Sequence, residues 1–341
     1  MKLQETLAFD DVLLVPQYSD IESRKDTDIS SWLDGEIKLS IPIISSPMDT
    51  VTGHVMACEI SILGGLGILH RYSSIDEQAD WVKYCKDNYA SHVGVAVGST
   101  GDFLERTEKC LNAGANVICV DVAHGDHISV KNAIRDIRNK FGWRIHVMAG
   151  NVATKEAFDH LAHWGADSIR VGVGGGSICS TRIQTGHGMP TLASIIDCKD
   201  TTFNAKLIAD GGIKSSGDIV KALAAGADFV MLGSMLAGTN ETPGEIFEEN
   251  GKQYKVYRGM ASKEAQIAWK GSYSSFEGVA SKVACKGHLP NVLDDIARNI
   301  RSGLSYSGAK DLVELRAKAK FIKQSGAAQI ESSPHILIRH G

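Results

Sequence analysis

The residues of this chain best suited to chemistry lie in one glycine-rich run, Gly172-Val173-Gly174-Gly175-Gly176-Ser177-Ile178-Cys179-Ser180-Thr181. Glycines let backbone N–H and C=O groups face a ligand or an ion with no side chain between them. Cys179 is the only one of the seven cysteines in such a loop, where a thiolate can act as a nucleophile. The alternative is a thiol with a purely structural role.

Two further polar turns are suited to holding a phosphate and a sugar. Asp210-Gly211-Gly212 and Gly233-Ser234 each follow a short apolar run. Backbone N–H groups in such turns bind phosphate, and the hydroxyls of Ser177 and Ser234 can add donors. A carboxylate repels phosphate, so Asp210 is better suited to accept hydrogen bonds from a hydroxyl pair, as on a ribose. Together the turns indicate a sugar phosphate or a nucleotide, while each one alone is equally compatible with an ordinary turn.

The elements that position these residues follow from alternating patterns along the chain. Eight short apolar runs predict strands buried on both faces, at Pro42–Ser45, Leu66–Leu69, Val93–Val97, Val117–Val120, Ile145–Met148, Ser168–Val171, Leu207–Ala209 and Phe229–Leu232. Segments of helical period lie between them, at His54–Leu63, Ser74–Lys86, Gly101–Ala113, Ile128–Lys140, Lys155–Trp164, Thr191–Asp197 and Gly217–Ala225. This alternation favours an α/β fold of the (β/α)8 TIM barrel type over an open doubly wound sheet.

Three turns of one pattern, Gly-Ala followed by Asn or Asp, precede predicted strands at 114–116, 165–167 and 226–228. A glycine that ends a helix, followed by a polar turn residue, is typical of a helix-to-strand loop. The barrel is expected over about residues 40–250, with an N-terminal and a C-terminal addition, the latter helical from Leu289 to Lys323. We therefore expect residues 1–341 to form a single catalytic domain. Because active residues of such barrels follow the strands, the polar turns would meet on one face.

Composition excludes several classes of protein. With 36 basic and 40 acidic side chains and a net charge of −4, the chain offers no basic patch for nucleic acid. It has no signal peptide, no apolar stretch long enough to span a membrane, and no C-x-x-C pair, so we expect a cytoplasmic protein with reduced thiols and no membrane partner. Neither a Rossmann G-x-G-x-x-G fingerprint nor a metal-binding histidine motif is present.

Several long motifs resemble the IMP dehydrogenase/GMP reductase family. They occur in the family's order between about residues 7 and 335, as Phe9–Pro16, Ser46–Val51, Gly176–Arg182, Ala209–Ile213 and Tyr257–Met260. The resemblance implies a (β/α)8 barrel, usually a homotetramer, that acts on a purine nucleotide monophosphate with a nicotinamide cofactor. The family binds nicotinamide on an open barrel face, which agrees with the missing Rossmann motif.

The resemblance also implies roles for individual residues. Cys179 matches the nucleophile that attacks C2 of the purine, and Thr181 and Glu277 match a proton relay. Positions that hold the substrate are matched by Ser46, Met48, Ser177, Asp210, Gly212, Gly233, Ser234, Tyr257, Gly259, Met260 and Ala261. Asp121 and Asn151 match cofactor-binding positions, and Gly174, Gly176 and Cys179 match a site for a monovalent cation such as K+.

Two features of the sequence separate the branches of this family. His70-Arg71-Tyr72-Ser73 runs straight on to Val93, so the inserted regulatory domains usual in dehydrogenases are missing. The segment Ala261–Phe276 contains no arginine, so the Arg-Tyr pair with which dehydrogenases activate water is also missing. Both absences favour a GMP reductase that uses NADPH to convert GMP to IMP and ammonia.

Other features favour an IMP dehydrogenase that uses NAD. Ser46-Pro47-Met48 has the dehydrogenase form, Ala261 replaces a serine common in reductases, and the tail from Ser325 to His335 resembles the dehydrogenase C-terminus. Gly175 stands where the family usually has proline, which leaves a third alternative, a nucleotide-binding protein without turnover. The sequence shows no pattern that distinguishes NADPH from NADH.

Overall fold

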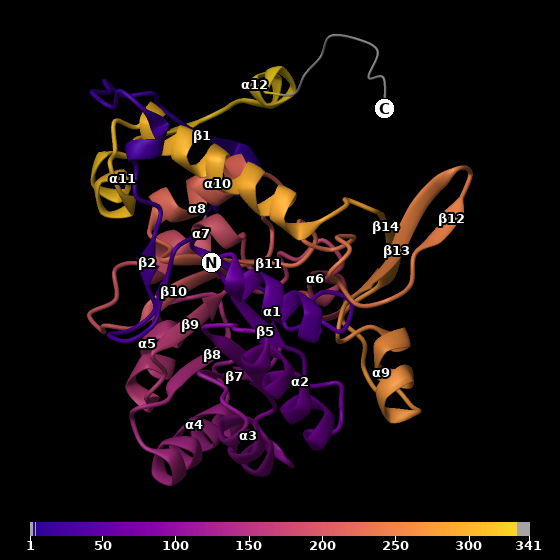
Figure 1. Ribbon diagram of the computed structural model, residues 1–341. Helices are drawn as coiled ribbons and strands as arrows, with labels where there is room; N and C mark the ends of the chain where they lie inside the picture. The colour runs from indigo at the N-terminus through magenta and orange to yellow at the C-terminus, as the bar shows by residue number, and fades with distance from the viewer. Residues whose placement is uncertain (1–2, 4, 333–341) are drawn as a thin grey trace.

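Eight parallel strands close into a barrel in the computed structural model, which describes residue 3 and residues 5–332 (Figure 1). The strands are β4 (Ile43–Ser45), β5 (Leu66–Leu69), β6 (Val93–Val97), β7 (Val117–Asp121), β8 (His146–Val152), β9 (Ser168–Val171), β10 (Lys206–Asp210) and β11 (Phe229–Leu232). Each strand pairs with its neighbours in sequence, and β11 pairs with β4 to close the ring. The predicted (β/α)8 barrel is confirmed.

A ring of helices covers the outside of the barrel. They are α1 (His54–Ile62), α2 (Ile75–Asp87), α3 (Phe103–Asn112), α4 (Ile128–Phe141), α5 (Lys155–Trp164), α7 (Thr191–Cys198) and α8 (Ser216–Ala225). The local sequence fixes their ends: α5 begins where Thr154 Oγ1 accepts from the backbone N–H of Ala157 and ends at Gly165, which is left-handed. The predicted ranges agree with these helices to within about two residues at each end.

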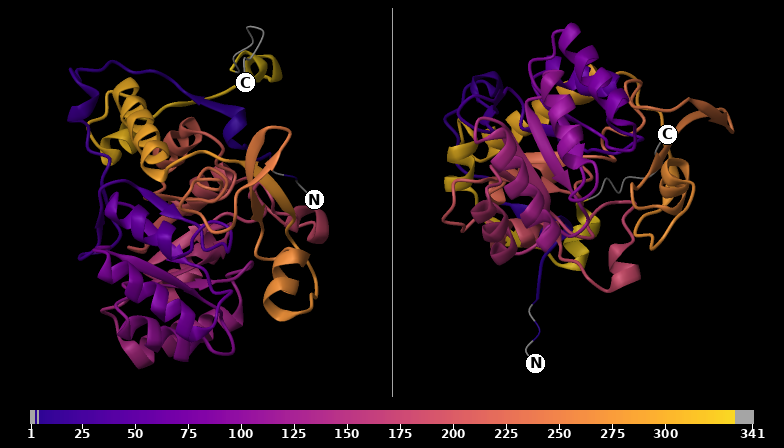
Figure 2. Two further views of the ribbon diagram at one scale, coloured as in Figure 1. Left: turned by 45° about the vertical axis from the view of Figure 1, so that its right-hand side comes forward. Right: turned by 90° about the horizontal axis from the view of Figure 1, so that it is seen from below.

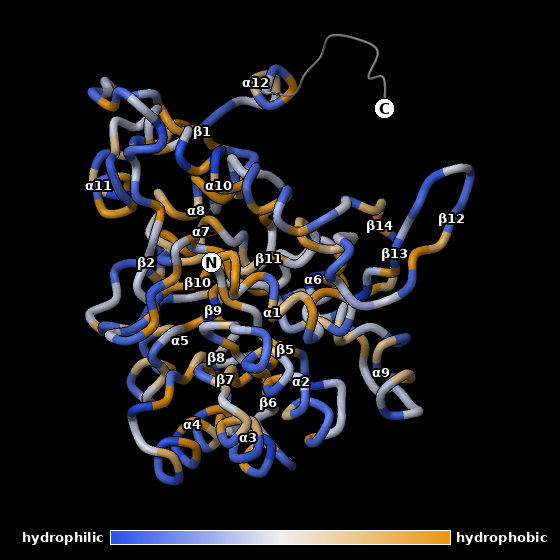
Figure 3. Tube along the Cα trace, viewed as in Figure 1, coloured by the Kyte–Doolittle hydropathy of each residue, from blue (hydrophilic) through white to orange (hydrophobic). Residues whose placement is uncertain are grey.

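The barrel interior is filled by side chains and closed at its amino end by a small hairpin. Ile44, Ile68 and Met148 from the strands pack with Leu33 and Leu39. The last two belong to or adjoin β2 (Ser31–Trp32) and β3 (Lys38–Leu39), which pair antiparallel. Figure 3 shows the hydrophobic strands at the centre and hydrophilic colours on the outer helices. The opposite, carboxyl end of the barrel is therefore the end left for a site.

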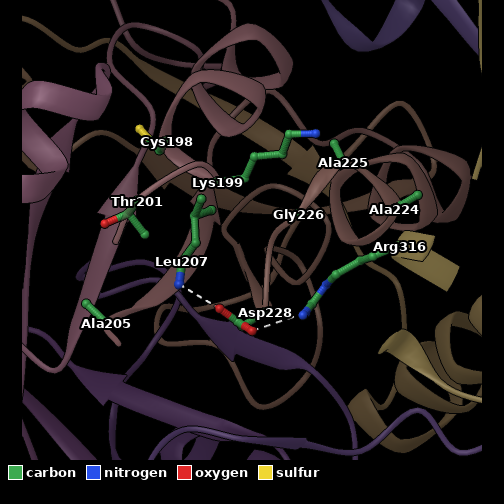
Figure 4. A pocket seen from close by; sticks show the side chains of 10 residues that line it. All are labelled: Cys198, Lys199, Thr201, Ala205, Leu207, Ala224, Ala225, Gly226, Asp228 and Arg316. Atoms are coloured by element: carbon green, nitrogen blue, oxygen red, sulfur yellow. Dashed lines mark hydrogen bonds and ion pairs between the residues drawn. The ribbon is translucent and has the colours of Figure 1, made fainter. Parts of the chain in front are cut away.

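The three Gly-Ala-Asn/Asp turns share one structural role. In each, the polar side chain accepts a hydrogen bond from a backbone N–H at the start of the preceding strand: Val93 to Asn116 (3.1 Å), Val147 to Asp167 (2.7 Å) and Leu207 to Asp228 (2.9 Å). The backbone N–H of each polar residue donates back to the same partner's carbonyl at 2.8 Å. Figure 4 shows Asp228 joined by dashed lines to the Leu207 nitrogen and to Arg316. These three residues line a cavity of about 300 Å³ at the amino ends of β10 and β11. The turns thus fasten β6 to β7, β8 to β9 and β10 to β11.

The C-terminal addition is only partly helical. α10 (Leu289–Tyr306) and α11 (Leu312–Lys318) agree with the predicted helical tail from Leu289 to Lys323, but its last three residues, Phe321–Lys323, form a strand instead because they pair with Val12–Leu14. Between the barrel and α10, however, β12 (Phe247–Glu249), β13 (Lys252–Arg258) and β14 (Ala280–Ala284) form an antiparallel arm that the sequence did not predict. The arm projects from the barrel beside α9 (Lys263–Lys270), as both views in Figure 2 show. Most of its side chains are exposed, so its strands lack an apolar pattern.

A segment near the N-terminus pairs with one near the C-terminus on the outer surface. β1 (Val12–Leu14) pairs antiparallel with β15 (Phe321–Lys323), and α12 (Gly326–Glu331) follows (Figure 1). Short 3-10 turns lie at Phe9–Asp11 and Arg24–Asp26. Within the part of the chain that the structure describes, we find no helix with the length and apolar character needed to cross a membrane.

Candidate active site

One cavity of about 590 Å³ opens at the carboxyl end of the barrel, lined by residues that follow most of its strands. All the candidate residues named from the sequence line it: Ser46, Met48, Asp121, Asn151, Gly174, Gly176, Ser177, Cys179, Thr181, Asp210, Gly212, Gly233, Ser234, Tyr257, Gly259, Met260, Ala261 and Glu277. The fold therefore brings together residues that lie more than two hundred positions apart in the sequence.

Cys179, Thr181 and Glu277 form a chain of hydrogen bonds at the mouth of this cavity. The Cys179 thiol lies 3.1 Å from Thr181 Oγ1, and the Thr181 hydroxyl donates to Glu277 Oε2 at 2.7 Å. Backbone bonds hold the two segments together, since Ser180 N donates to Glu277 O (2.8 Å) and Val279 N donates to Ile178 O (3.0 Å). The arrangement can carry a proton from the sulfur through the hydroxyl to the carboxylate.

The other cysteines stand in a different environment. Burial raises the pKa of Cys85, Cys110, Cys119 and Cys198 to about 12, and burial also raises the pKa of Cys58. These five thiols are buried in the core. Of the seven cysteines, only Cys179 and Cys285 are half-buried, and only Cys179 lines the large cavity.

A buried arginine joins the acidic residues of the site. Arg170, on β9, donates through Nε and Nη2 to Asp210 Oδ2 at 3.1 and 2.8 Å, and through Nη1 to Asp121 Oδ1. Asn151 Nδ2 donates to the same Asp210 oxygen at 2.8 Å and to Gly172 O at 2.9 Å. Burial alone would lower the pKa of Arg170, but the two carboxylates more than offset it and raise that pKa well above its usual value. Asp210 is thus held with its second oxygen, Oδ1, left for a ligand.

The turn after β11 packs tightly against the residues predicted to hold a nucleotide. A Cβ added to Gly233 would lie 2.9 Å from Tyr257 Oη and 3.2 Å from Met48 Sδ, so only glycine fits this position without displacement. Burial raises the pKa of Tyr257, although its hydrogen bond with Ser177 opposes that shift. Lys286 Nζ donates to the carbonyls of Ser234 (2.5 Å) and Met235 (3.0 Å). These bonds fix the orientation of the peptide units that form the predicted phosphate turn.

The segment that leads to Glu277 is attached to the barrel at its beginning. Arg258 Nε donates to Asp49 Oδ2 at 2.9 Å, and the Tyr72 hydroxyl donates to Met260 O at 2.9 Å. The Tyr72 ring also stacks on Trp269 of α9, with centroids 5.8 Å apart and planes 10° apart. The wall of the cavity on this side is therefore built jointly by β5's loop and the segment after β13.

Several lining residues escaped the sequence reasoning. Arg170, Tyr72, Thr191 and Lys214 line the cavity, but none of them was named as a candidate from the sequence. Arg170 did carry a signal, because it is a charged residue inside a strand whose other side chains are fully buried. Such a residue needs charged partners, and the nearby acidic turns supply them.

The residues predicted to hold a monovalent cation share the same loop. Gly174, Gly176 and Cys179 lie in the turn that precedes α6 (Thr181–Thr185), and the Gly176 carbonyl already accepts from Cys179 N at 3.1 Å. Residues 333–335 of the tail that resembles the dehydrogenase C-terminus lie outside the described residues. Within the described chain, no group of three or more His, Cys, Asp or Glu side chains is placed to hold a metal ion.

The fold and the cavity define a (β/α)8 barrel of the kind that gathers polar groups at the carboxyl ends of its strands. A family model described as IMP dehydrogenase / GMP reductase domain matches residues 6–335. The chain belongs to this family of oxidoreductases, which use a nicotinamide cofactor, and the resemblance noted in the sequence is confirmed.

Individual relatives come from both branches of the family. The inosine-5′-monophosphate dehydrogenase of Nitrosopumilus maritimus is 35% identical over 472 residues, with 98% of this chain and 99% of that protein covered. The Bacillus subtilis dehydrogenase is 33% identical, with 97% and 96% covered. A solved structure of GMP reductase from Trypanosoma brucei, in complex with guanosine 5′-monophosphate, is 28% identical with a TM-score of 0.93, covering 98% of this chain and 99% of that one.

Proposed function

We propose that this protein is a GMP reductase, which reductively deaminates GMP to IMP and ammonia with NADPH. The observation that carries the proposal is the segment Ala261–Phe276, which leads to Glu277 at the mouth of the cavity and contains no arginine. Hydrolysis of a covalent intermediate needs a base that activates water, and this segment offers none of the guanidinium groups that the dehydrogenase branch uses. Release of ammonia needs a proton donor instead, and the Thr181–Glu277 pair can supply it.

The reaction divides into two steps at C2 of the purine. In the first, the Cys179 sulfur forms a bond to C2 and the bond from C2 to the exocyclic nitrogen breaks, with Thr181 and Glu277 passing protons to the departing amine. NADPH, when bound, supplies a hydride to C2. In the second step the bond between C2 and the sulfur breaks, which releases IMP and returns the electron pair to Cys179. One cofactor is oxidised and one purine carbon is reduced.

The substrate we infer is a purine nucleotide monophosphate, seated along the cavity from the phosphate turn to the cysteine. Gly212, Gly233, Ser234, Ser177 and Tyr257 would hold its phosphate, and Asp210 Oδ1 would accept from its ribose. The guanosine 5′-monophosphate bound by the related reductase supports this assignment.

The same proposal assigns the rest of the cavity. Ser46, Met48, Gly259, Met260 and Ala261 would surround the base, while Asp121 and Asn151 would face the nicotinamide half of the cofactor. The carbonyls of Gly174, Gly176 and Cys179 would hold K+. We further propose a homotetramer of single-domain chains, which a light-scattering mass at micromolar protein would test.

A second candidate function is IMP dehydrogenase, which converts IMP, NAD and water to XMP and NADH. The dehydrogenase form of Ser46-Pro47-Met48 and the names of the curated relatives favour it. Against it, the alignment with the Nitrosopumilus maritimus protein spans 472 residues, more than the 341 of this chain, so that relative carries segments with no counterpart here.

A paired assay separates these candidates. Purified protein is mixed with GMP and NADPH, or with IMP and NAD, and the nicotinamide absorbance is followed. We expect loss of NADPH that depends on GMP and disappears in Cys179→Ala. NADH formation from IMP, without GMP-dependent oxidation, would replace the reductase by the dehydrogenase. Nucleotide binding without either reaction would replace both by a binding protein.

A further inference from the structure

We propose that Gln266 is a positioning residue that holds Glu277 in hydrogen-bonding contact with Thr181. The inference rests on the proposed role of Glu277 in proton transfer, but it does not depend on the direction of the overall reaction. Gln266 does not line the cavity, and neither the sequence motifs nor the proposed chemistry uses it.

The Gln266 side chain makes three hydrogen bonds within one short segment. It is buried, with 8% of its surface exposed. Nε2 donates to Ala261 O at 3.1 Å and to Ser275 O at 3.0 Å, and Oε1 accepts from the backbone N–H of Ser274 at 3.2 Å. Two donors and one acceptor of the amide are therefore satisfied by backbone groups. The side chain ties the start of the segment to its end.

These contacts reach Glu277 through a shared acceptor. Ala261 O accepts both from Gln266 Nε2 and from the backbone N–H of Glu277, the latter at 3.0 Å. Ser275, the other acceptor, lies two residues before Glu277. Loss of the Gln266 amide would thus remove one of the two hydrogen bonds to Ala261 O and the hydrogen bond to Ser275 O, which restrain the chain leading to Glu277.

Gln266 is the main hydrogen-bonded anchor of this loop. Within the described residues, the hydrogen bonds of the stretch 272–276 all go to the Gln266 side chain. Its position is fixed in turn by α9, whose first turn is capped by the buried Ser262: Oγ accepts from Ala265 N at 3.1 Å and the carbonyl accepts from Gln266 N. Tyr72 contacts the same segment through Met260 O and the Trp269 ring. Together these contacts hold the segment against the loop that carries Cys179.

A double-mutant cycle tests the proposal. Gln266→Met keeps the length and packing of the side chain but removes its three hydrogen bonds. We expect kcat to fall about 10- to 100-fold while the dissociation constant for the nucleotide changes by less than about threefold, since a displaced acid–base group costs that much. In a Glu277→Gln background, the same change should lower kcat by less than about twofold, because its partner no longer acts. Glu264→Gln, on the exposed side of the same helix, is the matched control and should leave kcat unchanged.

A second measurement does not require turnover. Glu277→Gln removes a negative charge near the Cys179 sulfur, which favours the thiolate, so alkylation of Cys179 by iodoacetamide at fixed pH should accelerate several-fold. Gln266→Met should accelerate it in the same direction. Half-buried Cys285, read by mass spectrometry in the same digest, should keep its rate and report any general loosening.

The outcomes separate the two proposals. A wild type that oxidises IMP with NAD ends the reductase assignment, yet the cycle run on that reaction still decides the role of Gln266. The positioning role is overturned if Gln266→Met leaves kcat and Cys179 alkylation unchanged. It is also overturned if Gln266→Met lowers kcat equally with and without Glu277, or if Cys285 accelerates together with Cys179.

Discussion

Arg170 and Asp210 face each other across neighbouring strands at the mouth of the barrel, with Nη2 and Oδ2 2.8 Å apart. Their side chains are almost completely enclosed, 8% and 13% exposed. Arg170 also bonds Asp121, which has a second cationic partner in Arg71 at 3.8 Å. One guanidinium is therefore shared between the two acidic groups that the proposed function assigns to the ribose and the cofactor. Arg170 therefore helps to position Asp210 in the proposed nucleotide-binding part of the cavity and Asp121 in the proposed cofactor-binding part.

Removing this cation should destabilise the fold. Arg170→Met leaves Asp210 without a cationic partner and leaves Asp121 with Arg71 alone, and breaking such an enclosed ion pair typically costs about 3–5 kcal/mol. We expect the free energy of unfolding, measured with denaturant, to fall by that order, and nucleotide affinity to fall with it. Arg135→Met removes an exposed ion pair and should change stability by less than about 0.5 kcal/mol. Equal stability of the Arg170 and Arg135 variants would contradict this account of the network.

The hydrogen-bonded chain at Cys179 gives a graded set of variants. Cys179→Ala should abolish turnover, whereas Thr181→Val and Glu277→Gln should lower kcat about 100- to 1000-fold by removing proton transfer. Nucleotide dissociation constants measured by calorimetry should stay within about threefold of wild type. Retention of substantial turnover by Cys179→Ala would exclude covalent catalysis at this sulfur.

His70 makes the stability of the protein depend on pH. Its pKa is lowered from 6.5 to about 4, mainly by burial and also by Arg258 and Arg106, while Asp49 opposes the shift. Between pH 6.5 and 4 the unfolded chain binds a proton that the folded chain does not, so stability falls as the pH falls through this range. One pKa unit corresponds to about 1.4 kcal/mol, so this group alone removes about 3 kcal/mol.

A phenylalanine at this position checks that dependence. His70→Phe keeps the aromatic contact with Trp81, whose ring centroid lies 4.9 Å away, but cannot bind a proton. We expect its free energy of unfolding to decline less steeply than that of wild type between pH 6.5 and 4. Parallel stability curves for the two proteins would show that His70 does not control the dependence.

Lys286 supports the proposed phosphate turn from behind. Lys286→Met removes the donor to the Ser234 and Met235 carbonyls and should raise the dissociation constant for GMP roughly tenfold, or about 1.4 kcal/mol. Lys282→Met, four residues earlier on the exposed arm, is the control and should leave it unchanged. A similar effect for the free nucleoside would contradict an action through the phosphate.

The sequence predicted the barrel well because its strands are continuous apolar runs between amphipathic helices. Runs such as Val93–Val97 are buried on both faces and stand out from their surroundings. The arm could not be found in this way, since all three residues of β12, three of the seven in β13 and four of the five in β14 are exposed, and the strands carry no continuous apolar run. Their pairing is set by contacts between strands distant in sequence, such as Tyr257 with Ser281.

Site residues that belong to a sequence motif could be predicted. Residues whose role depends on hydrogen bonds to distant parts of the chain could not. The glycine loop, the acidic turn and Glu277 were named from the sequence and line one cavity. Gln266 was not, because an isolated glutamine on a short helix gives no signal until its three backbone partners are seen. Arg170 could have been found, as a lone charge within a buried strand.

The three Gly-Ala-Asn/Asp turns divide the barrel into modules. The hydrogen bonds of each turn, here called a lock, join a strand to the one before it, so β6–β7, β8–β9 and β10–β11 form three strand pairs. Helix α4 connects the first pair to the second, and the segment that contains α7 connects the second pair to the third. A chain severed between Phe141 and His146 would keep every one of these locks whole, one in the first fragment and two in the second. The protein is therefore suited to reassembly from two separately expressed pieces divided there, whereas a cut between β8 and β9 would separate the two halves of a lock.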